Sequence, residues 1–71
     1  MPIKGAVYRH YKGSTYCVVC VATNEADETP VVVYQSVLEL EKIWVRPLAS
    51  FMETVEHNNT RIPRFSLIAE Q

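Results

Sequence analysis

The sequence has 71 residues, of which 48% are hydrophobic and 21% are charged, with a net charge of −1. Such a chain has room for one folded domain, which we assign to residues 1–71, and its composition excludes disorder. The charge excludes a strongly basic nucleic-acid-binding domain, and no apolar run is long enough to span a membrane, so we expect a cytoplasmic protein.

The apolar pattern predicts five or six short strands separated by turn-forming residues. The expected strands cover residues 7–12, 16–22, 31–36, 43–46, 53–57 and 61–65. Residues 23–30 are polar and acidic and are expected to form a loop. Residues 37–42 are expected to end a strand and turn, and residues 66–71 either fray or tuck in.

Prolines and asparagines mark the breaks between the later elements. Pro47 opens a segment, residues 47–52, whose apolar spacing predicts one helical turn. Asn58-Asn59 predicts a tight hairpin turn, because asparagine tolerates positive φ, and Pro63 confines the last strand to an edge. Together these elements predict a mainly β fold, a small SH3-like barrel of five or six short antiparallel strands with one short helical turn.

Cys17 and Cys20 form a C-x-x-C pattern within a run of strand-forming residues. In a regular strand, residues three apart point to opposite faces and stand about 10 Å apart. We therefore expect two inert strand cysteines, neither bridged nor sharing a metal, and no metal site or cofactor.

Charged and aromatic residues alternate along the segment from Tyr8 to Gly13. On a strand, Arg9 and Tyr11 share one face, and Tyr8, His10 and Lys12 share the other. One interpretation is a docking surface for an anion or a planar group, because arginine donates paired hydrogen bonds and tyrosine offers a stacking platform. The alternative is a solvated strand whose aromatic rings cover the core.

Trp44 and Arg46 form a second such pair. If Ile43 and Val45 face the core, Trp44 and Arg46 are exposed together as a binding anchor. Alternatively, Trp44 is buried and Arg46 covers it by a cation–π contact. Tyr34 and Gln35, which close an apolar run, are further candidates for the rim of a site.

Catalytic motifs of the common hydrolase, P-loop and zinc-protease classes are absent from the sequence. His57 lies beside the Asn-Asn turn and is expected at the surface. His10 is the candidate general base, and such a role predicts a concave pocket with a carboxylate within reach.

Several short segments together carry a family resemblance. They are Tyr8-Arg9-His10-Tyr11-Lys12-Gly13, Tyr16, Val33-Tyr34-Gln35, Trp44-Val45-Arg46-Pro47, Phe51 and Arg64-Phe65. In this order they resemble domain-of-unknown-function family 1653, over nearly the whole chain. The resemblance implies a small bacterial domain with a compact SH3-like barrel and no assigned activity. The chain departs from the family pattern at residues 23–26 and 41–43, where relatives tend to carry a histidine followed by Glu-Thr, and a glycine, respectively.

Three hypotheses about function follow. The first is a binding module for a protein, a nucleic acid or an anionic ligand, monomeric or weakly dimeric, whose site consists of Arg9, His10, Lys12, Tyr34, Gln35, Trp44 and Arg46. It depends on the regions around His10 and Trp44 being neighbouring strands. The second is an enzyme that uses His10 as general base and Arg9 or Arg46 as an anion clamp. The third is a structural domain in which Trp44 buries against a second copy.

Overall fold

The computed structural model describes residues 1–70, which form seven strands and one helical turn. The chain is mainly β, as predicted. The elements are β1 (Val7–His10), β2 (Thr15–Asn24), β3 (Thr29–Ser36), β4 (Ile43–Pro47), α1 (Leu48–Phe51), β5 (Thr54–His57), β6 (Thr60–Pro63) and β7 (Phe65–Ala69).

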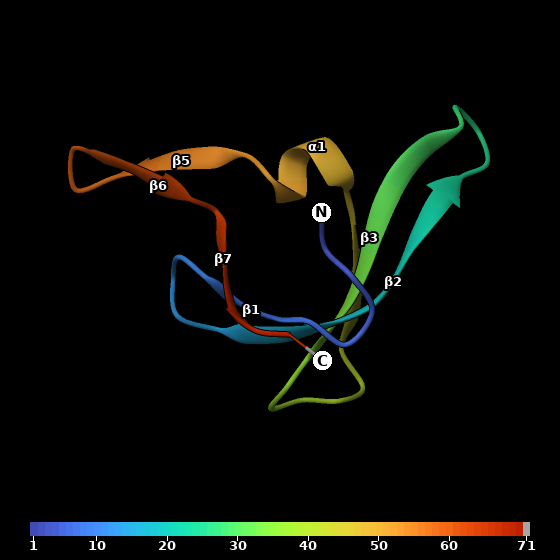
Figure 1. Ribbon diagram of the computed structural model, residues 1–71, viewed down its shortest axis with the longest axis horizontal. Helices are drawn as coiled ribbons and strands as arrows, with labels where there is room; N and C mark the ends of the chain where they lie inside the picture. Colours follow the sequence, from blue (N-terminus) through green and yellow to red (C-terminus); the bar gives the residue numbers. More distant parts are fainter. Residues whose placement is uncertain (71) are drawn as a thin grey trace.

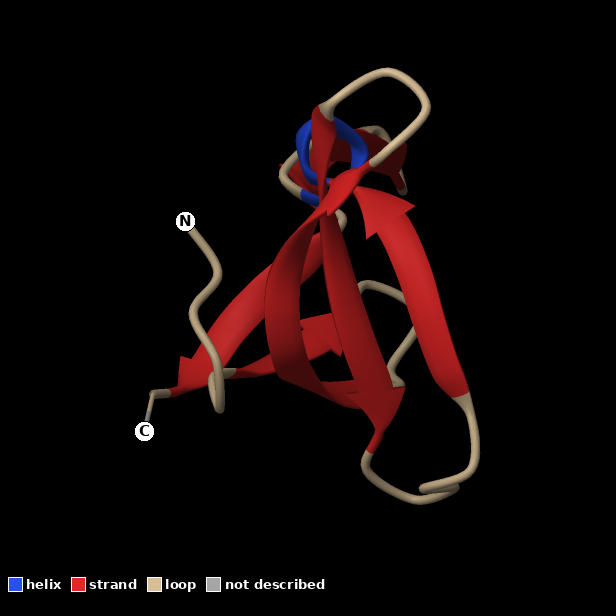
Figure 2. Cartoon of the chain, turned by 90° about the vertical axis from the view of Figure 1, so that its right-hand side faces the viewer, coloured by secondary structure: helices blue, strands red, loops and turns tan. Residues whose placement is uncertain are grey.

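The strands form two antiparallel sheets (Figure 1). The main sheet has the order β4-β3-β2-β1-β7, and β5 pairs with β6 as a separate hairpin. Over residues 1–70, β4 and β7 are therefore the two edges of one open sheet, and the closed barrel predicted from the sequence does not form. The main sheet is strongly twisted and curled, as the side view in Figure 2 shows.

Alternation along the strands separates an inner face of the main sheet from an outer face. Tyr8, Tyr16 and Tyr34 lie on the inner face, and the register pairs Tyr8 with Tyr16 and Tyr34 with Trp44. Ile43 and Val45 point to the outer face and are 56% and 63% exposed. Of the two alternatives for this segment, the one in which Ile43 and Val45 face the core is wrong, and Trp44 and Arg46 point to the inner side.

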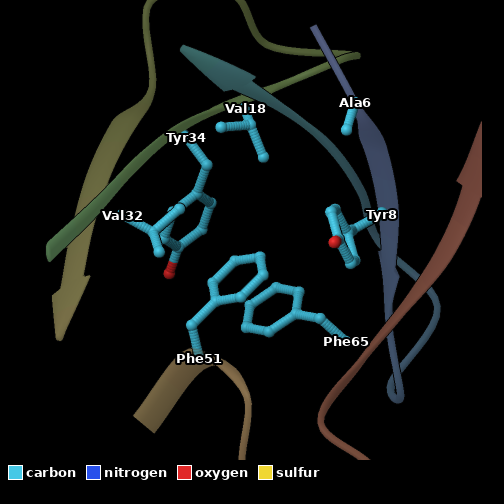
Figure 3. Close-up of a cluster of buried hydrophobic side chains, with 7 residues drawn as sticks. All are labelled: Ala6, Tyr8, Val18, Val32, Tyr34, Phe51 and Phe65. Atoms are coloured by element: carbon cyan, nitrogen blue, oxygen red, sulfur yellow. The ribbon is translucent and has the colours of Figure 1, made fainter. Parts of the chain in front are cut away.

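Aromatic rings fill the space between the inner face and α1 (Figure 3). Phe51 rises from α1, is 1% exposed, and stacks on Phe65 with ring centroids 4.1 Å apart. Tyr8 and Tyr34 meet Phe51 edge-on, with centroid distances of 5.1 and 5.5 Å. This arrangement suits the ring quadrupoles, and it fastens the four-residue helix to the sheet.

The asparagine turn forms as predicted, with φ values of +52° at Asn58 and +62° at Asn59 between β5 and β6. Several boundaries differ from the prediction. The long β2–β3 hairpin extends to a short turn at residues 25–28, so half of the expected loop, residues 23–24 and 29–30, is strand. Beyond Pro63, the chain forms a seventh strand, β7, which pairs with β1. Gln71, part of the segment expected to fray or tuck in, lies outside the described residues.

The prediction that Cys17 and Cys20 point to opposite faces is wrong, because a β-bulge lies between them. The register passes from Val18 opposite Tyr34 to Cys20 opposite Val33, which leaves Val19 as the extra residue. Cys17 lies opposite Gln35, and Gln35 and Val33 share the outer face of β3. Cys17 and Cys20 therefore share this face too, and both are half-buried free thiols.

Candidate functional site

Five strands contribute to a cleft of about 200 Å³ on the inner side of the main sheet. It is lined by six residues, and this "aromatic–arginine cleft" consists of His10, Tyr16, Tyr34, Trp44, Arg46 and Phe65. The expectation that the strands of His10 and Trp44 are neighbours is wrong, because β2 and β3 lie between β1 and β4. The curl of the sheet nevertheless brings side chains of β1 and β4 to one cleft.

Arg46 is the half-buried cation of this cleft. Its Nε donates to the Tyr34 hydroxyl at 3.4 Å, and its Nη1 donates to the Ser50 hydroxyl at 3.0 Å. The guanidinium carbon also lies 5.9 Å from the centroid of the Phe65 ring, which is within the range of a cation–π contact. Neutral groups thus hold the guanidinium in place.

A second arginine, Arg64, supports the same corner of the fold. Its Nε donates to the Ser50 carbonyl at 3.2 Å, and its Nη2 pairs with the Glu53 carboxylate at 3.1 Å. Ser50 in α1 therefore accepts from both arginines, through its hydroxyl and its carbonyl. The charge of Arg64 is partnered, whereas the ion pairs found in residues 1–70, Arg64–Glu53 and Lys42–Glu39, do not include Arg46.

His10 stands at the end of β1 with its ring edge-on to Phe65, at a centroid distance of 5.0 Å. Its Nδ1 accepts the backbone N–H of Lys12 at 3.1 Å, so the neutral ring carries its proton on Nε2. Burial lowers the pKa of His10, and the positive charges of Arg46, Arg64 and Lys12 lower this pKa further. The ring is therefore neutral near pH 7, with Nε2–H as its hydrogen-bond donor.

The hypothesis that His10 is a general base predicts a carboxylate within reach of its ring. The charged groups that shift the pKa of His10 are three cations, Arg46, Arg64 and Lys12. Such surroundings attract an anion and weaken the imidazole as a base, because they disfavour the imidazolium that proton abstraction would produce.

The aromatic–arginine cleft continues into a second, more polar hollow of about 330 Å³. Tyr16 and Trp44 line both spaces. Beyond them, the polar residues that line the second hollow are Ser14, Thr15 and Ser36 and the ion-paired Lys42 and Glu39. Trp44, which is 46% exposed, thus presents part of its indole to solvent between the two.

Four of the seven sequence-predicted site residues, His10, Tyr34, Trp44 and Arg46, meet in the aromatic–arginine cleft. The other three do not line it. Arg9 points to the outer face of β1 and borders a separate hollow with Ile62 and Pro63.

Lys12 and Gln35 have local structural contacts. Lys12 lies in the turn after β1, 5.8 Å from the Tyr11 ring, and acts on the cleft through its charge and its backbone N–H. Gln35 donates from Nε2 to the Leu40 carbonyl at 2.6 Å and braces the turn before β4.

Sequence reasoning missed Tyr16 and Phe65 in the cleft wall and Ser50 and Arg64 behind it. Tyr16 could have been found, because it alternates with Val18 on the buried side of a clear strand. Arg64 lies between β6 and β7, directly after Pro63, and Phe65 begins β7, an edge strand with no alternating pattern. Ser50 stands in no recognisable motif.

Residues 1–70 contain no group of three or more histidine, cysteine or acidic side chains arranged to hold a metal ion. Within the same span, no helix is long and apolar enough to cross a membrane.

Comparison with known proteins defines the family. Residues 6–67 match the family described as "Protein of unknown function (DUF1653)". The chain belongs to this family. A crystal structure of a DUF1653 protein from Bordetella bronchiseptica resembles this domain with a TM-score of 0.83 and 30% sequence identity, over 97% of this chain and 91% of the other. A search of curated proteins found no match. The function of the DUF1653 domain is thus not given by its relatives, and its site must be interpreted from its own chemistry.

Proposed function

We propose that this protein is a small binding module whose aromatic–arginine cleft accepts an anionic group attached to a flat apolar group. One observation carries the proposal: Arg46 is half-buried in the cleft and takes part in neither ion pair of the described residues. Removing a charge from water is costly unless the charge is paired. An anionic ligand would supply the missing counter-charge.

The hydrogen bonds of Arg46 leave room for such a ligand. A guanidinium has five N–H groups, and the contacts with Tyr34 and Ser50 use two of them. The remaining N–H groups suit a carboxylate or phosphate, which arginine binds through paired hydrogen bonds. The Nε2–H of His10 offers a further donor, and the rings of Tyr16 and Trp44 offer apolar faces to a flat group.

One further feature supports this proposal, and two related proposals, on the fold relationship and on the compartment, accompany it. Each of the six cleft residues lies in one of the segments on which the family resemblance was recognised. SH3-like barrels bind ligands through aromatic grooves, and an SH3-like relationship for this bent sheet is part of the proposal, by analogy of fold. The two free thiols suit a reducing compartment, so we place the module in a bacterial cytoplasm.

Titration with benzoate, which joins a carboxylate to a flat ring, tests the proposal. We expect the NMR signals of His10, the Trp44 indole and Arg46 to shift together. Arg46→Gln should weaken binding at least about tenfold, because a charged hydrogen bond contributes about 1.5–3 kcal/mol. Arg9→Gln is the matched control, since Arg9 is exposed on the outer face, and it should change the affinity less than about twofold. Equal effects of the two variants, or shifts spread over the outer face, would contradict the proposal.

A further inference from the structure

The strand β4 forms an open edge of the main sheet. In the described part of the chain its one hydrogen-bonded neighbour is β3. The Ser36 N–H donates to the Lys42 carbonyl at 3.0 Å, which identifies this position as a hydrogen-bonded pair. Because such pairs recur every second residue, Tyr34 with Trp44 and Val32 with Arg46 are also of this kind. The N–H and C=O groups of Ile43 and Val45 therefore point away from β3, toward the free edge.

From Ile43 to Val45, this edge lacks the features that usually protect a sheet edge. Edge strands are commonly shielded by charged side chains, prolines, bulges or a covering element. Ile43, Trp44 and Val45 are consecutive apolar residues, 56%, 46% and 63% exposed, and the β3–β4 register runs through them without a shift. Pro47 lies only at the end of the strand. The edge is thus a regular, exposed row of unpaired backbone groups.

The open edge and the aromatic–arginine cleft share residues. Trp44 and Arg46 point into the cleft from the same strand whose backbone is open at Ile43 and Val45. A strand added beside β4 would alternate in the same way, with every second side chain on the inner side of the sheet. An inward side chain opposite or diagonal to Arg46 is then within reach of its guanidinium.

We propose that the partner of this protein is an extended polypeptide segment that pairs with β4 as an additional strand and places an acidic side chain on Arg46. This inference rests on the proposed function, because it names the partner that would bring the anion to the cleft. The outward side chains of the segment are apolar and extend the exposed row of Ile43 and Val45. Main-chain hydrogen bonds supply the affinity, and the cleft supplies the specificity.

Charge favours such a segment over a second copy of this chain. The two-fold pairing that matches the open groups sets Ile43 against the second copy's Val45. In that register Arg46 lies opposite the second copy's Lys42, which is paired with Glu39, so the second copy places no unpaired carboxylate opposite Arg46. An acidic segment instead gives Arg46 the counter-charge that it lacks among the described residues.

The probe is an acetylated seven-residue peptide of alternating valine and glutamate, added to the intact protein and followed by NMR hydrogen exchange. The amides of Ile43 and Val45 should exchange at least about tenfold more slowly in the complex. The amides of Trp44 and Arg46, which already bond to β3, should change much less. Two further peptides carry N-methyl groups on one or the other set of alternate amides, and we expect one set to abolish binding and the other to preserve it.

Two protein variants complete the test. Val45→Pro removes one outward N–H and should weaken peptide binding at least tenfold, while Val45→Thr keeps the N–H, changes only the side chain and should weaken binding much less than Val45→Pro. If Val45→Pro does not fold, the N-methylated peptides still decide the question. Equal binding of both N-methylated peptides, or no binding at millimolar peptide, would overturn the inference. So would a dimer in light scattering whose β4 amides are protected without peptide.

The benzoate titration separates this inference from the proposed function. If benzoate binds at Arg46 but the peptide leaves the Ile43 and Val45 amides unprotected, the cleft is an anion site and the polypeptide partner is wrong. If benzoate also fails to bind, the proposed function itself is wrong.

Discussion

Replacing Phe51 with alanine is expected to remove a large part of the stability of the domain. Phe51 is 1% exposed and contacts the rings of Tyr8, Tyr34 and Phe65. Truncating a buried phenylalanine costs about 3–5 kcal/mol, through lost burial and the cavity that remains. At about 0.05–0.15 kcal/mol per residue, a domain of 71 residues has a total stability of only about 4–11 kcal/mol. Phe51→Ala therefore leaves a marginally stable or unfolded chain.

Urea unfolding followed by circular dichroism measures this effect, with the free energy obtained from the midpoint at an unchanged slope. The melting temperature should fall by at least about 12 °C. Met52→Ala is the matched control, because Met52 is the next residue and is 51% exposed, and it should cost less than about 1 kcal/mol. If Phe51→Ala lowers the free energy of unfolding by less than about 1.5 kcal/mol, the interpretation that the packing of Phe51 holds α1 against the sheet is refuted.

The remaining predictions concern His10 and the asparagine turn. The pKa of His10 is lowered by burial and by its cationic neighbours, so the neutral ring stabilises the fold above about pH 6.5, and this contribution is lost as the pH falls through the lowered value. In urea unfolding, the free energy of unfolding should decrease less between pH 7 and pH 5 for His10→Gln than for the wild type. A titration midpoint of the His10 ring above 6.5 would contradict the argument. Because a bound anion favours the imidazolium, benzoate affinity should rise as the pH falls from 7 to 5.5 in the wild type but not in His10→Gln. Asn59 has φ of +62°, so Asn59→Val should cost about 1–2 kcal/mol in urea unfolding. Asn59→Gly should cost nothing, and a loss for Asn59→Val no larger than that of Thr60→Val would argue against backbone strain.

Local chemistry made parts of this fold predictable. The turn at Asn58 and Asn59 depends on the φ preference of the turn residues themselves, and the helical turn after Pro47 depends on a fixed φ at its start. Both appear close to their expected positions. The existence of six strands likewise follows from runs of β-branched and aromatic residues, although their ends shift by a few residues.

Features that depend on distant parts of the chain were not predictable. Strand β7 contains Leu67 and Ile68, both 46% exposed, and forms because β1 offers it an edge, which no pattern in residues 65–69 indicates. The inward direction of Trp44 and Arg46 depends on which side of the sheet α1 covers. The bulge at Val19 stands in a run of valines and has no sequence signature.

The sequence predicted which types of residue form the candidate site better than it predicted which individual residues line it. The side-chain chemistry of His10, Tyr34, Trp44 and Arg46 predicts a site, and these residues converge in one cleft. The chemistry of Arg9 predicts the same, but Arg9 lies outside the cleft. The difference between His10 and Arg9 is one step of strand alternation, and only the pairing of β1 with β2 and β7 decides which of the two points inward.

The bulge at Val19 has a practical consequence for experiments on this protein. Because it brings Cys17 and Cys20 to the outer face, both thiols lie on the side of the sheet that faces away from the aromatic–arginine cleft. A single-cysteine variant could carry a fluorophore or spin label there without obstructing a ligand. A label on either thiol would then report the binding of a ligand to the opposite face of the sheet.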